Sequence, residues 1–242
     1  MITHSAMSGV RHGFFTRQGG VSEGGFASLN CSDRSADEPR RVAENRGLAA
    51  GMLGFPAGAL IGVHQVHGVA VAVLEEAWAT RPVADALVTA RAGHLLGIVT
   101  ADCAPVLFAA EGVVGAAHAG WRGAVAGVLE ATLDAMRALG ARDITAVVGP
   151  CIAQPSYEVS ADLRDGVLIR DPSDACFFQE GRPDRWQFDL AGYCLARLRA
   201  AGAHAHATGD DTLADPARFF SHRRRTLDGG GLIGHQLSAI GL

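Results

Sequence analysis

Three short segments of the chain each place an imidazole or a thiol beside turn-forming residues at the end of an apolar run. They span residues 64–68, 100–105 and 117–123 and carry His67, Cys103 and His118. Two imidazoles and a thiolate suit zinc, and three protein ligands leave a fourth position for water or substrate. A structural zinc site normally closes with a fourth Cys or His, which is not evident here. We therefore predict a catalytic metal centre formed by His67, Cys103 and His118.

The same side chains permit a second chemistry, in which Cys103 is the nucleophile and His118 the base of an amide hydrolase. The remaining histidines do not extend the ligand set. His64 is three residues from His67, an odd separation that puts the two on opposite faces of a strand. Four more are predicted to be ordinary packed or surface side chains: His94, His204, His206 and His235.

The segment after His118 has a further property. Gly120-Trp121-Arg122-Gly123 leads from a predicted strand into a predicted helix, where unpaired backbone N–H groups and the helix dipole favour an anion. Arg122 adds a bidentate donor at the same place. We therefore expect phosphate to bind next to His118, whereas Trp121 is predicted either to pack or to stack on a substrate.

Hydrophobic periodicity indicates the elements that must position these residues. Short apolar runs bounded by turn residues predict buried strands, and apolar positions at helical spacing predict three helices. Because helices interrupt the strands at irregular intervals, the pattern favours an α+β fold over a strictly alternating parallel one. The expected strands are 60–63, 69–74, 84–89, 95–100, 105–110, 113–117 and 144–148, and the expected helices are 37–53, 124–139 and 189–200.

Composition restricts the class of protein. The chain of 242 residues is 48% hydrophobic and shows neither a repeat nor a linker, so we expect one domain over residues 1–242. A formal net charge of -4 argues against a nucleic-acid partner. No apolar stretch is long enough to span a bilayer, so no membrane partner is expected. Five scattered cysteines without a CxxC pair, and no signal-peptide pattern, favour a reducing cytoplasm.

Several longer motifs resemble one family over nearly the whole chain. QVHG at 65–68, TADCAPVLF at 100–108, AAHAGWRG at 116–123, GPCI at 149–152 and FFSHRR at 219–224 are similar to the polyphenol oxidase or laccase-domain family. TRQGGVS at 16–22, SLN at 28–30 and ENR at 44–46 extend the match. Members of that family have been reinterpreted as purine nucleoside phosphorylases that also deaminate adenosine.

The resemblance implies a role for particular residues. His67, Cys103 and His118 match the family's zinc ligands, and Arg46 matches a position expected to line the substrate or phosphate pocket. The implied fold is a layered α/β sandwich of mixed sheets with flanking helices, similar to the deamidase domain of cytotoxic necrotizing factor. Arg223, after an aromatic pair, is expected to reach the pocket. The C-terminal part departs from the family at Asp211-Thr212, where Cys-Thr is usual, at His222, where Tyr is usual, and at Arg225, where Asp is common.

The candidate activities make different demands. A multicopper oxidase needs many paired histidines, but this chain has 10 histidines and one HxH pair, His204-Ala205-His206. If phenol oxidation occurs, copper at the same three ligands is the simpler account. Phosphorolysis of adenosine, inosine or methylthioadenosine needs phosphate held near the ribose and a proton donor for the leaving purine. Asp85, Asp102 and Glu158 are the candidate donors, and we place Asp102 in the catalytic set with Cys103 and His118.

Deamination of adenosine would use the same metal site, with a nearby carboxylate or His64 as the general base, because the HxE…PCxxC pattern of cytidine deaminases is absent. The resulting hypothesis is a zinc-dependent purine nucleoside phosphorylase with adenosine deaminase activity. Phosphate is expected to bind through Arg122, with Arg46 and Arg223 as further binding residues. A metal-dependent polyphenol oxidase and a Cys103/His118 amide hydrolase are the alternatives.

Overall fold

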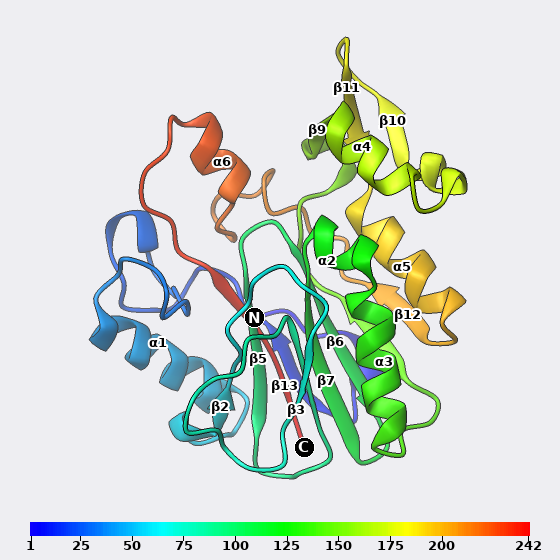
Figure 1. Ribbon diagram of the computed structural model, residues 1–242. Coiled ribbons are helices and arrows are strands. Elements are labelled where there is room, and N and C mark those ends of the chain that lie inside the picture. The colour runs from blue at the N-terminus through cyan, green and yellow to red at the C-terminus, as the bar shows by residue number, and fades with distance from the viewer.

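The structure, a computed structural model that describes residues 1–242, contains two large β-sheets, one small sheet and six α-helices (Figure 1). The four-stranded sheet has the order β1-β13-β5-β2, and the six-stranded sheet has the order β12-β8-β6-β7-β4-β3. A three-stranded sheet, β10-β11-β9, projects beyond them at the top right of Figure 1.

The bounds of the elements are as follows. The four-stranded sheet contains β1 (Arg11–Phe14), β2 (Leu60–Ile61), β5 (Leu95–Thr100) and β13 (Gln236–Gly241). The six-stranded sheet contains β3 (Val71–Val73), β4 (Ala86–Thr89), β6 (Ala104–Ala110), β7 (Val113–Ala119), β8 (Thr145–Val148) and β12 (His204–Ala207). The small sheet contains β9 (Glu158–Ser160), β10 (Phe178–Glu180) and β11 (Arg185–Phe188). The helices are α1 (Pro39–Met52), α2 (Trp121–Ala126), α3 (Val128–Ala138), α4 (Ala161–Leu168), α5 (Leu190–Ala200) and α6 (His222–Leu227).

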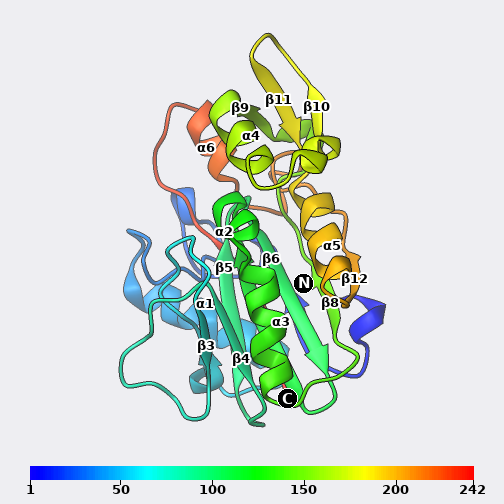
Figure 2. The ribbon, with the colours of Figure 1, turned by 45° about the vertical axis from the view of Figure 1, so that its right-hand side comes forward.

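The two large sheets form the inner layers of a sandwich, and helices cover the outer faces. The sequence of strand β6 is apolar throughout, because alternate side chains point into different hydrophobic cores. Leu107 packs between the two sheets with Ile98 and Ile240, whereas Phe108 faces the helices α3 and α5. Helix α1 covers the other sheet, where Ala49 packs in a third core. Figures 1 and 2 show α1 on one side of the molecule and α3 with α5 on the other.

This architecture confirms the predicted α+β class, with mixed sheets and flanking helices. The strand predicted at residues 95–100 is β5, and helix α5 begins after Asp189, whose carboxylate accepts a hydrogen bond of 2.8 Å from the Gly192 N–H. At α1 the cap position is Glu38, and the Asp37 carboxylate is directed elsewhere, toward Ser22 and Asn30.

The single helix predicted over residues 124–139 is wrong. The chain becomes helical three residues earlier, at Trp121, and the helix is interrupted at Gly127. This glycine has a φ of 104° and separates α2 from α3. This left-handed conformation costs little for glycine alone. The apolar face continues across the break, so periodicity did not reveal it. Helix α2 therefore has only 6 residues.

The strand register brings several chain segments to one edge of the sandwich. Strand β5 ends where β13 begins, with Thr100 opposite Gln236, and β6 begins where β7 ends, with Ala104 opposite Ala119. The residues just outside these strand ends therefore meet at the same edge, below α2, α4 and α6 in Figure 1. None of the helices is both long and apolar enough to cross a membrane.

Candidate active site

His67, Cys103 and His118, which are far apart in sequence, meet at this edge. Their potential ligand atoms all lie within 4.8 Å of one another, and the His67 Nε2 atom lies 3.9 Å from the Cys103 Sγ atom. The imidazole rings of His67 and His118 meet edge to face, with centroids 4.6 Å apart. His118 is buried, Cys103 is half-buried and His67 is exposed, so the group opens toward solvent on one side.

Asp85, which directly precedes β4 and is fully buried, organises two of these ligands. Its carboxylate accepts a hydrogen bond of 2.8 Å from His118 Nδ1, and this bond leaves Nε2 of His118 to face the group. The same carboxylate accepts backbone N–H bonds from Val66, His67 and Gly68, at 2.6–3.2 Å. His67 has a φ of 63°, and these bonds hold the turn in that left-handed conformation.

The glycine after the His118 strand leaves space for the other ligands. A Cβ atom on Gly120 would lie 3.0 Å from His67 Cδ2 and 3.1 Å from Cys103 Sγ. Both distances are shorter than ordinary carbon contacts, so a side chain here would push the ligands apart. Gly123 has a comparable restriction, because its Cβ would lie 2.9 Å from the carbonyl oxygen of Gly68. The Gly-Trp-Arg-Gly motif is thus needed for close packing against the turn that carries His67.

Neighbouring groups shift the pKa values of Cys103, His118 and Asp85. Burial opposes ionisation of the Cys103 thiol, but the His118 charge and hydrogen bonds from both imidazoles lower its pKa to about 6. Burial alone would lower the pKa of His118, whereas the Cys103 thiolate and the Asp85 carboxylate raise it to about 9. Burial would raise the pKa of Asp85, but hydrogen bonds from His118 and from the backbone hold this pKa below its usual value. The lowered pKa favours the thiolate form of Cys103, which is the form that binds metals.

The donor set fits a metal ion. Tetrahedral zinc with two nitrogen ligands and one sulfur ligand needs donor atoms about 3.3–3.6 Å apart, so the spread of up to 4.8 Å requires the side chains to rotate toward one another. The Asp85–His118 pair supplies the carboxylate behind the imidazole that metal sites commonly have. This is the one group of three or more His, Cys, Asp or Glu side chains in the structure arranged to hold a metal.

A second set of contacts joins the Cys103 loop to the C-terminal part of the chain. Asp102, with a φ of 88°, accepts hydrogen bonds from the hydroxyls of Thr212 (2.7 Å) and Ser221 (3.0 Å) and from the backbone N–H of Arg223 (2.6 Å). Ser221 also caps α6 by accepting from the Arg224 N–H. The carboxylate beside Cys103 thus fixes the start of α6 at the pocket.

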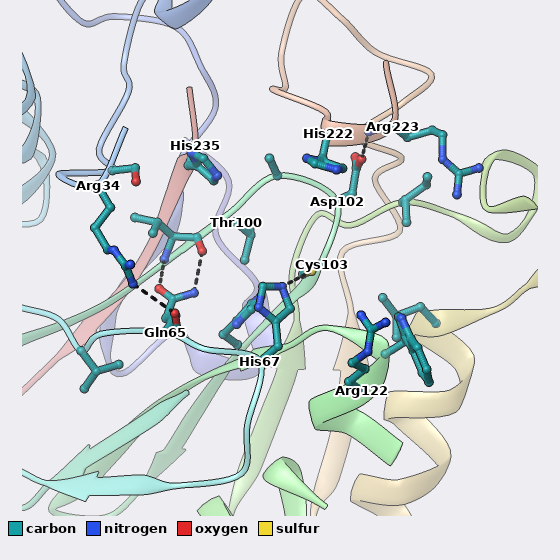
Figure 3. A pocket seen from close by; sticks show the side chains of 18 of the residues that line it. Arg34, Gln65, His67, Thr100, Asp102, Cys103, Arg122, His222, Arg223 and His235 are labelled. Carbon is teal, nitrogen blue, oxygen red and sulfur yellow. Dashed lines mark hydrogen bonds between the residues drawn. The ribbon is translucent and has the colours of Figure 1, made fainter. Parts of the chain in front are cut away.

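A pocket of about 630 Å³ surrounds the metal-ligand group. This volume suits a small organic ligand such as a nucleoside. Figure 3 shows Arg122 and Arg223 on one side of His67 and Cys103, with Arg34, Gln65, Thr100 and His235 on the other. The lining residues outside the metal ligands are Ser32, Asp33, Arg34, Val63, Gln65, Val99, Thr100, Ala101, Asp102, Trp121, Arg122, Ile152, Tyr157, Leu190, His222, Arg223 and His235.

The predicted site residues do not all lie in this pocket. The three candidate metal ligands line it together with Asp102, Arg122 and Arg223, but Arg46 does not. The Arg46 guanidinium instead donates to the carbonyl oxygens of Cys31 and Leu60, and burial lowers its pKa. Arg46 therefore stabilises the loop that precedes Ser32 without lining the pocket itself. His64 is likewise outside the lining, where its backbone bridges to Val83.

Sequence reasoning also missed residues. His235 was expected to be an ordinary histidine, yet it lines the pocket, as do Thr100 and Tyr157. No local motif marks His235, because it follows a glycine-rich loop and enters the site only through the pairing of β13 with β5. Among the three candidate proton donors, Asp85 is buried behind His118, and Glu158 pairs with Arg182 outside the lining.

The sequence of the chain places it in a known protein family. Residues 11–242 match the family described as "Multi-copper polyphenol oxidoreductase laccase", and the chain belongs to this family. The chain is 42% identical to a Deinococcus radiodurans protein named "Purine nucleoside phosphorylase", with 96% of this chain and 89% of that protein covered. It is 39% identical to "Purine nucleoside phosphorylase SCO2081" of Streptomyces coelicolor, covering 90% of this chain and 91% of that one.

Solved structures agree with this assignment. YlmD from Geobacillus stearothermophilus superposes with a TM-score of 0.89 at 32% identity, covering 98% of this chain and 93% of that one. Protein NMB0706 of Neisseria meningitidis, assigned to DUF152, gives a TM-score of 0.88 at 32% identity, with 97% and 95% covered. The resemblance stated from the motifs is therefore confirmed at the level of the family.

Proposed function

We propose that this chain is a zinc-dependent purine nucleoside phosphorylase that cleaves adenosine, inosine or methylthioadenosine with phosphate. The observation that carries the proposal is the pocket, which joins a three-ligand metal group to two arginines in a chain about 40% identical to proteins with that name. Zinc is the metal proposed, because two imidazoles and a thiolate are its usual ligands. Copper at the same ligands is the alternative that the family description suggests.

In the proposed reaction, a phosphate oxygen forms a bond to C1′ of the ribose while the bond from C1′ to the purine nitrogen breaks. The electron pair of that bond leaves with the purine, which then takes up a proton. Arg122 and Arg223 both line the pocket, and we propose that they hold the phosphate, because a guanidinium binds phosphate with paired hydrogen bonds. Bound zinc would supply Lewis-acid stabilisation of negative charge on oxygen.

In this proposal the phosphate is bound mainly by the two arginines rather than by a helix terminus. Helix α2 has only 6 residues, so its dipole adds little beyond the N–H groups of its first turn. The Arg122 guanidinium lies over the Trp121 ring at 4.6 Å, which limits its motion at the pocket wall. The Arg223 guanidinium donates to the carbonyl oxygen of Glu158 at 2.8 Å and lies 5.5 Å from the Tyr157 ring.

Asp102 is assigned a positioning role within this proposal. Its carboxylate accepts three hydrogen bonds from the C-terminal part of the chain, and one of these holds the Arg223 backbone. We propose that Asp102 places Arg223 and His222 against the pocket.

Deamination of adenosine is proposed as a second reaction of the same pocket, in which water replaces the 6-amino group and ammonia leaves.

Product identification tests both reactions. Zinc-loaded protein is incubated with adenosine, inosine and methylthioadenosine, with and without phosphate. The expected result is free base and ribose 1-phosphate (or its methylthio derivative) only when phosphate is present, and inosine from adenosine without it. Free base formed equally without phosphate would refute phosphorolysis.

An amide hydrolase is the second candidate, because the Cys103 thiol, His118 and Asp85 form a chain of the kind that activates cysteine nucleophiles. Metal content separates the two proposals. Activity that disappears with zinc removal and returns with added zinc supports the metalloenzyme. Amide hydrolysis by metal-free protein, abolished by alkylation of Cys103, would support the hydrolase.

A further inference from the structure

The pocket has two chemically different arms on either side of the metal-ligand group. The cationic arm contains Arg122 and Arg223, and the polar arm contains Thr100 and His235 with Gln65 below them (Figure 3). Arg34 also reaches the polar arm, but it is exposed and donates to the Gln65 carbonyl oxygen at 3.5 Å, so it lies at the rim. The inner part of the polar arm is therefore formed by uncharged hydrogen-bonding groups.

Two atoms of the polar arm have no hydrogen-bond partner within the protein. The Thr100 Oγ1 and His235 Nδ1 atoms are both buried and unpaired, which is costly unless another group satisfies them. Thr100 as a whole is only 2% exposed. The Gln65 amide differs, because its nitrogen donates to the Val99 carbonyl oxygen (2.9 Å) and its oxygen accepts from the Val99 N–H (3.0 Å). Thr100 and His235 thus hold the free hydrogen-bonding capacity of this arm.

Both residues line the pocket, and strand pairing and hydrogen bonds hold their backbone there. Thr100 ends β5 opposite Gln236, so His235 directly precedes the residue that pairs with Thr100. The His235 N–H donates to the Asn30 side-chain oxygen at 3.0 Å, and the His235 carbonyl oxygen accepts from the Cys31 N–H at 3.1 Å. These two bonds hold the backbone of His235 on both sides of its Cα atom, at the pocket that its side chain lines.

The charge state of His235 suits a neutral ligand. Burial, together with the charges of His222, His118 and Arg225, lowers the pKa of His235 to about 4. A neutral imidazole donates at one nitrogen and accepts at the other, and a threonine hydroxyl does both. Such a pair can bind either an amino or an oxo group of a heterocycle, whereas it offers no charge to a phosphate.

We propose that Thr100 and His235 form the base-recognition wall of the pocket, which binds the hydrogen-bonding edge of the purine. The assignment rests on the proposed function. A phosphate that displaces the purine from C1′ with inversion approaches from the opposite side of the sugar. If phosphate occupies the cationic arm, the purine lies in the polar arm, where the two unpaired atoms are. The pair would accept adenine and hypoxanthine alike.

The experiment measures binding to zinc-loaded protein by calorimetry, with hypoxanthine, inosine and ribose 1-phosphate as probes. Thr100→Val removes the hydroxyl at nearly constant shape, and His235→Phe keeps a planar ring. Thr208→Val is the matched control, because its hydroxyl is also buried and unpaired but lies outside the pocket. Each pocket variant is expected to weaken hypoxanthine and inosine by about 2- to 10-fold, with unchanged zinc content and unchanged ribose 1-phosphate binding.

The outcomes separate the inference from the proposed function. Unchanged hypoxanthine binding in both pocket variants, or an equal loss for ribose 1-phosphate, would overturn the base-recognition wall. A wild-type protein that binds none of the probes would overturn it too. Wild-type protein that binds hypoxanthine through Thr100 and His235 but makes no ribose 1-phosphate would leave the wall standing and refute the phosphorylase. If His235→Phe fails to fold, Thr100→Val alone decides.

Discussion

Replacing Asp85 by Asn tests the idea that one buried carboxylate organises the metal centre. One carboxylate oxygen accepts from His118 Nδ1 and the His67 N–H, both at 2.8 Å, and the other accepts from the Gly68 N–H at 2.6 Å. An amide has only one acceptor oxygen, so its NH2 group must oppose at least one of these donors. If it faces His118, the imidazole must change tautomer and lose the ligand nitrogen that faces the group.

The expected effect follows from these contacts. Loss of one hydrogen bond to a charged acceptor costs about 1.5–3 kcal/mol of unfolding free energy in zinc-free protein. Loss of the orienting carboxylate weakens zinc by about 10- to 100-fold. Zinc affinity is measured by competition with a chromogenic chelator and stability by urea unfolding.

Asp37→Asn is the matched control, because the Asp37 carboxylate accepts comparable hydrogen bonds from Ser22, Asn30 and the Glu38 N–H outside the pocket. The control should lose stability without losing zinc affinity. Wild-type zinc affinity in Asp85→Asn, with the variant folded, would refute the reasoning.

Three further changes have distinct expected results. Gly120→Ala places a methyl group 3.0 Å from His67 Cδ2 and should leave the folded protein with substoichiometric zinc by elemental analysis, whereas Gly51→Ala, with nothing within 4 Å, should bind zinc normally. Gly127→Ala forces a φ of 104° on alanine and should lower the urea-unfolding free energy by roughly 1–2 kcal/mol; no change would show that the helix break relaxes. The pKa of His235 is lower in the folded protein than in the unfolded chain, so as the pH falls the unfolded chain takes up this proton at a higher pH. The free energy of unfolding should therefore decrease between pH 6.5 and about 4, by up to about 3 kcal/mol. His235→Phe should flatten that slope, and an unchanged slope would contradict the burial of a neutral imidazole.

Local sequence predicted the elements that have a strong local signal. Strand β5 and helix α5 follow from an apolar run and from a capping Asp189. The three candidate metal ligands could be named from the sequence because each lies in a distinctive motif at the end of a strand, and the structure brings them together. The break at Gly127 was missed because a lone glycine within an apolar helical pattern is usually tolerated.

What the sequence could not show is which distant segments meet. Asp85 was named only as one of three acids, because its role depends on a turn 17–19 residues earlier and on His118, 33 residues later. His235 joins the pocket through the pairing of β13 with β5, and nothing near it in the chain predicts that pairing. Arg46 was expected to face the pocket from the family motif, but the direction of its side chain is set by the carbonyl oxygens of Cys31 and Leu60.

The position of β13 has a consequence for biosynthesis. This last strand lies between β1 and β5, so the three candidate metal ligands are synthesised well before the strand that completes the four-stranded sheet. The nascent polypeptide can assemble the six-stranded sheet and its helices first, but the four-stranded sheet must wait for the carboxyl-terminal residues. The three candidate metal ligands can therefore come together before β13 is in place, whereas the pocket, which includes His235, can be completed only afterwards. A premature stop codon shortly before Gln236 would leave the ligand trio encoded and the pocket unfinished.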